Sequence, residues 1–211
     1  MENNVQTWSK VTKSIFTGVL LYSVATVAYA IFNPIANLAG AVDSVASFAG
    51  ESVNTGSSAL SLLCYLFLAG IVAGYVLFLL GLGNFSKVVN AQDGAAVGKV
   101  RTGTILVLIG VVVGALPIPV LSWLGELALC VIGYIMMLMG YSSLKASSTF
   151  PAKARSGASL LFIAMILIII GEVLGLIPFA GGFIEMPLDV IAFIMVLIGW
   201  SSIKNADPAA L

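Results

Sequence analysis

Four carboxylates are the side chains of this sequence that could do chemistry: Glu126, Glu172, Glu185 and Asp189. Each lies near the end of a strongly apolar run in the second half of the chain. Carboxylates in an apolar environment bind cations, exchange protons or pair with a charge on another molecule. These four are therefore candidate contacts for a monovalent cation, a proton or a partner protein.

Glu172 is the carboxylate that most needs an explanation. It lies near the C-terminal end of its apolar run, where the helix dipole disfavours negative charge. No Lys or Arg lies near that end in the sequence, and an ionised carboxylate without a partner is costly in an apolar environment. Four alternatives follow: Glu172 is protonated, reaches the lipid headgroups, binds a cation, or meets a charge on a partner protein.

The other three carboxylates have a simpler explanation. Glu126 falls in the first turns of one predicted helix, and Asp189 falls in the first turn of another. Glu185 lies 14 residues before Gly199, as Glu126 lies 14 residues before Gly140, so the two glutamates occupy equivalent depths. The dipole at a helix N-terminus stabilises carboxylates there, which accounts for them without a ligand.

The elements that carry these side chains are six apolar runs, most of them close to the roughly 20 residues that cross a bilayer. The chain is 60% hydrophobic and 9% charged, which is typical of a membrane protein. The sequence thus predicts an all-α integral membrane protein with six transmembrane helices. The predicted spans are Ser14–Phe32, Ala59–Leu82, Thr102–Leu116, Val120–Gly140, Gly157–Ile177 and Pro187–Ile203.

The basic residues predict the orientation. All nine fall in alternate gaps between the runs, and the other gaps contain no Lys or Arg. Because basic loops stay in the cytoplasm, both termini are predicted to be cytoplasmic. Lys10 and Lys13, the following apolar run and Ala28-Tyr29-Ala30 also resemble a secretory signal with its cleavage site. The run continues through Phe32, which favours a retained helix; cleavage would leave five spans.

The chain also repeats itself. Gly140-Tyr-Ser-Ser-Leu-Lys145 returns 59 positions later as Gly199-Trp-Ser-Ser-Ile-Lys204, with a weaker echo at residues 81–85. Lys99-x-Arg101-Thr-Gly103 returns as Lys153-x-Arg155-Ser-Gly157. Similarity at a fixed period predicts tandem hairpins, here parallel copies in a single domain over residues 1–211. Hairpin 1 covers about residues 14–82, hairpin 2 about 99–145 and hairpin 3 about 153–204.

Hairpin 1 has a long outer connection, residues 33–58. Asn33 and Pro34 predict a helix start, since Asn caps a helix and Pro suits its first position. Apolar residues recur from Ile35 to Val45 at helical spacing, with Asp43 among the polar positions. This predicts an amphipathic helix on the outer membrane surface, either a packed connector or a lid or docking helix.

Each hairpin carries two glycines four residues apart, a spacing that lets helix backbones approach closely in lipid. These glycines serve either packing inside the bundle or an oligomer interface, and one pair in every hairpin favours internal packing. The pairs are Gly70/Gly74, Gly110/Gly114 and Gly171/Gly175.

Several function classes find no support. The chain has no histidine, and Cys64 and Cys130 lie inside apolar runs, so neither a metal site nor a cofactor is expected. No nucleotide-binding motif occurs, and no basic patch is dense enough to follow a nucleic acid. An enzyme is therefore not expected.

The repeated unit has a basic entry, a glycine-rich helix and a Gly-x-Ser-x-x-Lys exit. Over about residues 81–204 it resembles the small bacterial membrane proteins of the HdeD-type acid-resistance family. The resemblance concerns architecture; it implies a stress-linked protein of the bacterial inner membrane and identifies no site residue.

Three functions follow, in order of preference. The first is a non-enzymatic accessory or assembly subunit of the inner membrane, working as a homo-oligomer or with another membrane protein. The second is a small cation or proton channel or carrier with an outer acidic vestibule, whose oligomeric pore would use polar residues such as Ser23, Thr26, Tyr65 and Tyr134. The third is a membrane-embedded binding module for an apolar small molecule.

Overall fold

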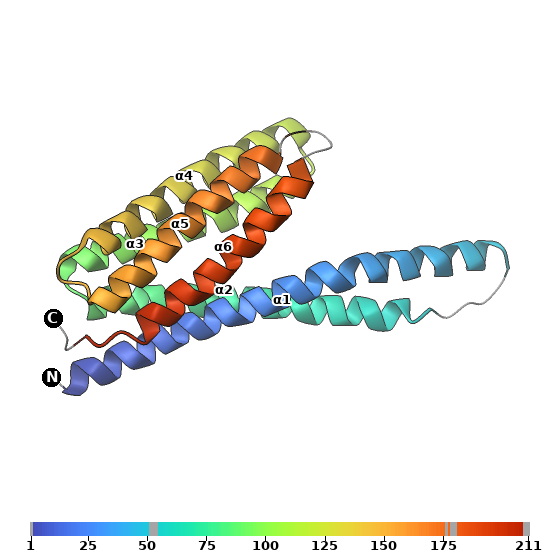
Figure 1. Cartoon of the computed structure of the whole chain (residues 1–211). Coiled ribbons are helices and arrows are strands. Elements are labelled where there is room, and N and C mark those ends of the chain that lie inside the picture. The colour runs from blue at the N-terminus through green and yellow to red at the C-terminus, as the bar shows by residue number, and fades with distance from the viewer. Residues whose placement is uncertain (1, 51–54, 176, 178–180, 209–211) are drawn as a thin grey trace. The chain divides into compact units, whose positions relative to one another are not determined.

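The structure is a computed structural model that describes residues 2–50, 55–175, 177 and 181–208. The described residues form six α-helices and no strand. Six of their helices are long and apolar enough to cross a membrane, which confirms the predicted number of candidate spans. The helices are α1 (Glu2–Phe48), α2 (Ser57–Val88), α3 (Ala91–Gly114), α4 (Pro119–Ala146), α5 (Ala152–Gly175) and α6 (Gly181–Lys204) (Figure 1).

The chain divides into two compact units, and the boundary falls inside α1 and α2 rather than at a connection. Unit 1 contains Met1–Phe16 and Leu79–Leu211, and unit 2 contains Thr17–Phe78. The single domain over residues 1–211 stays a prediction.

The helices extend beyond the predicted spans at the ends that carry basic residues. α3 begins at Ala91 instead of Thr102, and α4 continues to Ala146. The gaps between the predicted spans that carry basic residues, 83–101 and 141–156, are therefore largely helical. Hydropathy marks only the apolar part of a helix, whereas polar and basic residues continue the same helix outside that part.

The predicted separate helix after the first span is wrong, because α1 runs without interruption through Pro34 to Phe48. A proline inside a helix removes one hydrogen bond but need not end the helix, and helix formers follow it here. Asp43 fixes this part of α1 to the start of α2: its carboxylate accepts hydrogen bonds from the Thr55 backbone N–H at 3.1 Å and from the Ser57 hydroxyl at 2.6 Å. Residues 51–54 of the predicted outer segment lie outside the described residues.

Unit 2 is an antiparallel pair of helices. The Tyr22 and Tyr75 rings stack with centroids 4.5 Å apart, and Phe32 meets Phe67 at 5.6 Å. Gly74 faces the backbone of Tyr22, so the two helices touch without an intervening side chain. Most other apolar side chains of this pair point outward.

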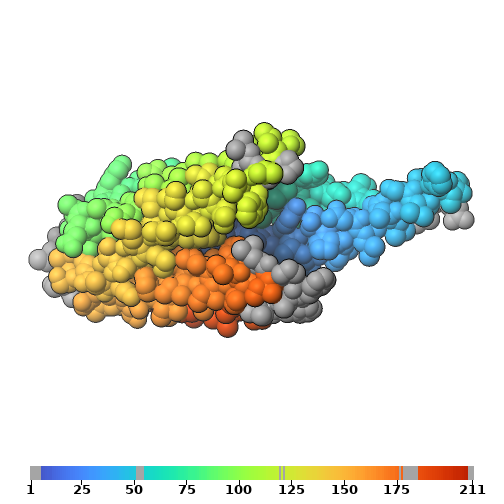
Figure 2. Space-filling model, turned by 90° about the horizontal axis from the view of Figure 1, so that it is seen from above, coloured from blue at the N-terminus to red at the C-terminus, as the bar shows by residue number. Residues whose placement is uncertain are grey.

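In unit 1, α3 packs along α4, α5 packs along α6, and α4 contacts α5. Figure 2 shows α4 in yellow and α5 in orange side by side on one face of the unit. The α3 and α4 backbones approach each other closely at Gly103 and Gly133, and those of α5 and α6 at Gly157 and Gly199. In both pairs the contacts show antiparallel helices.

An aromatic core closes the end of unit 1 near the chain termini. The Trp8 ring lies 4.9 Å from that of Phe85 and 5.8 Å from that of Phe150, and its Nε1 donates to the Ile203 carbonyl at 3.3 Å. Trp8 and Trp200 are buried, unlike the tryptophans of an interfacial aromatic belt. Their bulk fills the end of the bundle, and only Trp123 is exposed like a belt residue.

Candidate functional site

Glu126 and Glu185 occupy the same kind of position in two helix pairs. The Glu126 carboxylate on α4 lies against Gly114 on α3, and the Glu185 carboxylate on α6 lies against Gly175 on α5. In each pair the glycine leaves the room that the carboxylate fills. These two acids are therefore half-buried parts of the helix contact.

Glu172 lies on α5 and is exposed. The Tyr134 hydroxyl on α4 donates a hydrogen bond to its Oε1 over 3.4 Å, which is long for such a bond. The carboxylates of Glu185, Asp189 and Glu126 lie near enough for their charges to act on Glu172. The structure thus places the four candidate carboxylates within electrostatic range at one end of α3–α6.

Asp189 does not lie where the sequence predicted it. Because α6 begins at Gly181, Pro187 is inside the helix and Asp189 falls in a later turn. The helix dipole acts within the first turn, so it does not explain this carboxylate. Asp189 instead lies close to Gly171 on α5, with its Oδ1 3.4 Å from the position that a Cβ on the glycine would take.

The carboxylates do not form a metal-binding cluster. Among the described residues, no three His, Cys, Asp or Glu side chains could hold one metal ion together. The arrangement can hold or exchange protons and can attract monovalent cations from the solvent.

The glycine pairs all face a neighbouring helix of the same hairpin. Gly70 and Gly74 face Ala25 and Tyr22 on α1. Gly110 faces Cys130 and the Glu126 backbone carbonyl, with the Cys130 Sγ 2.9 Å from the position of an added Cβ. The remaining three, Gly114, Gly171 and Gly175, face the carboxylates described above.

The four polar residues suggested for a pore have different surroundings in the structure. Thr26 donates to the Tyr22 carbonyl of its own helix at 2.8 Å, and the Tyr65 side chain is 69% exposed on α2. Ser23 is buried in unit 2, and Tyr134 bonds to Glu172. Thr26 and Tyr134 thus have hydrogen-bond partners close by, whereas the pore itself stays a prediction.

At the opposite end of unit 1, three segments spaced by 59 residues share one pattern of burial. They are six-residue segments at or near the C-terminal ends of α2, α4 and α6: Gly81–Ser86, Gly140–Lys145 and Gly199–Lys204. In each segment the first, second and fifth residues are buried, and the sixth is half-buried. The weak echo in the sequence therefore has the same pattern of burial as the two strong copies.

No protein-family model, curated protein or solved structure matches this chain. The resemblance to HdeD-type proteins stays a prediction.

A polar network around the buried Asp93 at the start of α3 was not predicted from the sequence. Asn90 caps the helix by accepting from the Asp93 backbone N–H at 2.9 Å. Its Nδ2 donates to Asp93 Oδ2 at 2.7 Å, and the Thr149 hydroxyl donates to the same oxygen at 3.1 Å. The Asn-x-x-Asp spacing is a capping signal that would have revealed this buried carboxylate.

Proposed function

We propose that this chain is a non-enzymatic, multi-pass protein of the bacterial inner membrane that acts as an accessory or assembly subunit. It works as an oligomer or bound to another membrane protein, and both termini lie in the cytoplasm. The observation that supports this proposal is an exposed apolar seam on the second half of α1, formed by Ile35, Leu38, Val42 and Val45.

The length of α1 argues that lipid alone does not cover this seam. α1 has 47 residues, which corresponds to about 70 Å of helix, whereas the apolar core of a bilayer is about 30 Å thick. The polar first turns of α1 can lie outside that core, but the apolar part, Ile15–Phe48, is still about 51 Å long. Fitting this part into the core would need a tilt of about 54°, beyond the roughly 40° that membrane helices reach. Part of the apolar surface of α1 must therefore lie outside the core.

The spacing of the seam indicates what covers it. The four residues are separated by three, four and three positions, the alternation of a seam that packs against another helix. α2 does not cover them, since Leu38 is 69% and Val45 71% exposed. A helix of a second copy or of a partner protein is the occupant that fits this spacing.

Site-specific photo-crosslinking in native membranes tests the proposal. A photoreactive residue at Leu38 or Val45 is expected to give a discrete adduct, either of twice the mass of the chain or with one partner identified by mass spectrometry. The same probe at Asn37 or Ser44, exposed positions on the neighbouring face, serves as the matched control. Equal adduct yields at all four positions, with the protein fully inserted, would overturn the proposal.

The tandem organisation is part of the same proposal, and matching contacts support it. Gly140 faces Val100 and the Ala96 carbonyl, while Gly199 faces Leu161 and the Gly157 carbonyl. Glu126 against Gly114 and Glu185 against Gly175 follow the same spacing. Equivalent residues thus make equivalent contacts in the α3–α4 and α5–α6 pairs.

The second candidate function is a cation or proton channel or carrier, favoured by the hydrogen bond between Tyr134 and Glu172 amid the other carboxylates. Ion and proton flux into proteoliposomes is the test, with wild type beside Glu172→Gln. Asp43→Asn, a carboxylate of unit 2, is the matched control. Flux that falls at least severalfold only in Glu172→Gln would support conduction, and a silent, correctly inserted wild type would reject a channel made of this chain alone.

A further inference from the structure

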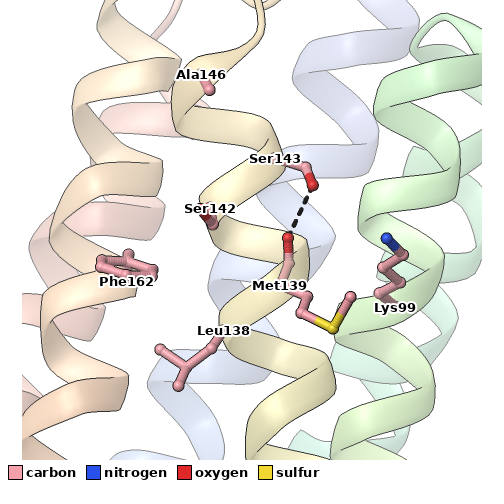
Figure 3. A pocket seen from close by; sticks show the side chains of 7 residues that line it. All are labelled: Lys99, Leu138, Met139, Ser142, Ser143, Ala146 and Phe162. Atoms are coloured by element: carbon pink, nitrogen blue, oxygen red, sulfur yellow. Dashed lines mark hydrogen bonds between the residues drawn. The ribbon is translucent and has the colours of Figure 1, made fainter.

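Two hollows of matching composition lie over the last turns of α4 and α6. The first has a volume of about 540 Å³ and lies over α4, where Figure 3 shows Lys99 on α3 and Phe162 on α5 to either side. The second has a volume of about 330 Å³ and lies over α6. The first is lined by Lys99, Leu138, Met139, Ser142, Ser143 and Phe162, and the second by Lys153, Leu197, Ile198, Ser201, Ser202 and Phe16.

The two hollows have equivalent residues on and directly after α4 and α6. The lining residues Leu138, Met139, Ser142, Ser143 and Ala146 correspond to Leu197, Ile198, Ser201, Ser202 and Asn205 at the constant spacing of 59. In each case the lysine comes from the preceding helix of the same pair. The phenylalanine comes from another helix, α5 or α1. The apolar and serine side chains thus recur in the same arrangement, whereas Lys153 lies about two helical turns nearer the start of its helix than Lys99 does, relative to the contacts that pair the helices.

Each hollow changes from apolar to polar along its helix. In the first, Leu138 and Met139 line the part toward the middle of α4, and Ser142 and Ser143 follow one turn later toward its end. The same order holds on α6. A phospholipid has this order as well, with acyl chains toward the membrane centre and the phosphate at the surface.

Each hollow is also flanked by a second, fixed cation. The Lys145 ammonium lies 3.6 Å from the centroid of the Phe162 ring, and the Lys204 ammonium lies 4.3 Å from that of Phe16. Cation–π contacts of this kind hold an ammonium group in one place. Among the described lining residues of both hollows none is acidic, so the positive charge is not neutralised locally.

We propose that each hollow binds one anionic phospholipid. The phosphate lies between Lys99 and the Ser142–Ser143 pair in one site, and between Lys153 and the Ser201–Ser202 pair in the other. An acyl chain of the same lipid follows the apolar part of the hollow. Basic pockets between membrane helices recognise anionic headgroups in this way, with each lysine near the surface contributing about 1 kcal/mol, a factor of about five in affinity.

The test counts bound lipids on the full chain in detergent by native mass spectrometry. Wild type is expected to retain two phosphatidylglycerol molecules and to prefer them over phosphatidylcholine of the same acyl length. Lys99→Gln and Lys153→Gln should each lose one of the two, with affinity at the altered site about fivefold lower. Lys99→Arg keeps the positive charge and should therefore still bind two phosphatidylglycerol molecules.

The matched control is the double variant Lys10→Gln/Lys87→Gln, compared with Lys99→Gln/Lys153→Gln. Both doubles lose two positive charges, but Lys10 and Lys87 line neither hollow. Equal loss in both doubles, or equal retention of phosphatidylcholine, would overturn the proposal. So would competition by inorganic phosphate at the lipid concentration, because the occupant would then be a free anion. The thermal midpoint of each variant without added lipid reports whether it is folded.

Discussion

Lys145, in the last turn of α4, holds its ammonium 3.6 Å from the centroid of the Phe162 ring on α5. Lys204, in the last turn of α6, makes the same contact with Phe16 at 4.3 Å. Both lysines also lie where the helix dipole favours a positive charge. Two effects therefore fix these cations at one end of unit 1.

Replacing Phe162 by Leu should lower the free energy of unfolding, because the cation–π contact with Lys145 is lost. Leu keeps an apolar side chain at this position, so the loss reports mainly on that contact. The contact itself should be worth about 0.5–1 kcal/mol, measured as the coupling energy of a double-mutant cycle with Lys145→Met. Denaturant unfolding in detergent gives the four stabilities. Phe48→Leu, at a side chain that is 98% exposed, is the control and should change little. A coupling energy near zero would reject the contact.

The glycines at which two helix backbones meet give a second prediction. A methyl group at Gly103 or Gly157 would collide with the backbone carbonyl of Gly133 or Gly199, so Gly103→Ala and Gly157→Ala should each destabilise the protein by about 1–3 kcal/mol. Gly98→Ala is the matched control on α3, because an added Cβ there meets nothing within 4 Å. This control should be neutral or stabilise the helix by up to about 1 kcal/mol. Thermal unfolding in the same detergent distinguishes the two classes.

The sequence predicts the number of helices well, because long apolar runs leave few alternatives. The position of a side chain along its helix is harder to predict, as the repeated motif that contains Lys99 and Lys153 shows. Contacts equate Val100 with Leu161, a spacing of 61, whereas Lys99 and Lys153 are 54 residues apart. The difference of seven residues is about two helical turns. Lys153 therefore lies on the same face of its helix as Lys99 does, but about two turns away along the helix axis. Periodicity alone cannot detect such a shift.

The candidate site was predictable in part. The sequence indicated that Glu126 and Glu185 are equivalent, and both lie against a glycine of the preceding helix. The position of Asp189 was missed because Pro187 was taken as the start of its helix, although helices can begin before a proline. The two hollows were missed because Phe16 and Phe162 come from helices that only the fold brings beside α6 and α4.

The polar network at the start of α3 gives a third prediction. Asp93 is 1% exposed and receives hydrogen bonds from Asn90 and Thr149. Both donors are exposed and can bond to water instead, so Asp93→Ala should cost the net contribution of two hydrogen bonds and lower the free energy of unfolding by about 1–3 kcal/mol. Gln92→Ala, at the exposed neighbouring position, should change it by less than about 0.5 kcal/mol. If Asp93→Ala and Gln92→Ala change the free energy of unfolding by the same amount in denaturant, the network does not contribute to stability.

The continuity of α1 gives the last prediction. If α1 runs through Pro34, then Pro34→Ala restores a hydrogen bond and removes a clash in the helix interior, which should stabilise the protein by up to about 3 kcal/mol. If Pro34 instead began a new helix, its fixed φ would be favourable and the substitution would be neutral or destabilising. Thermal unfolding in detergent measures the sign. Ala36→Gly is the complementary variant: it should destabilise a continuous helix by about 1 kcal/mol. If Pro34→Ala destabilises the protein, the continuous α1 would be contradicted and a separate helix that begins at Pro34 would be supported.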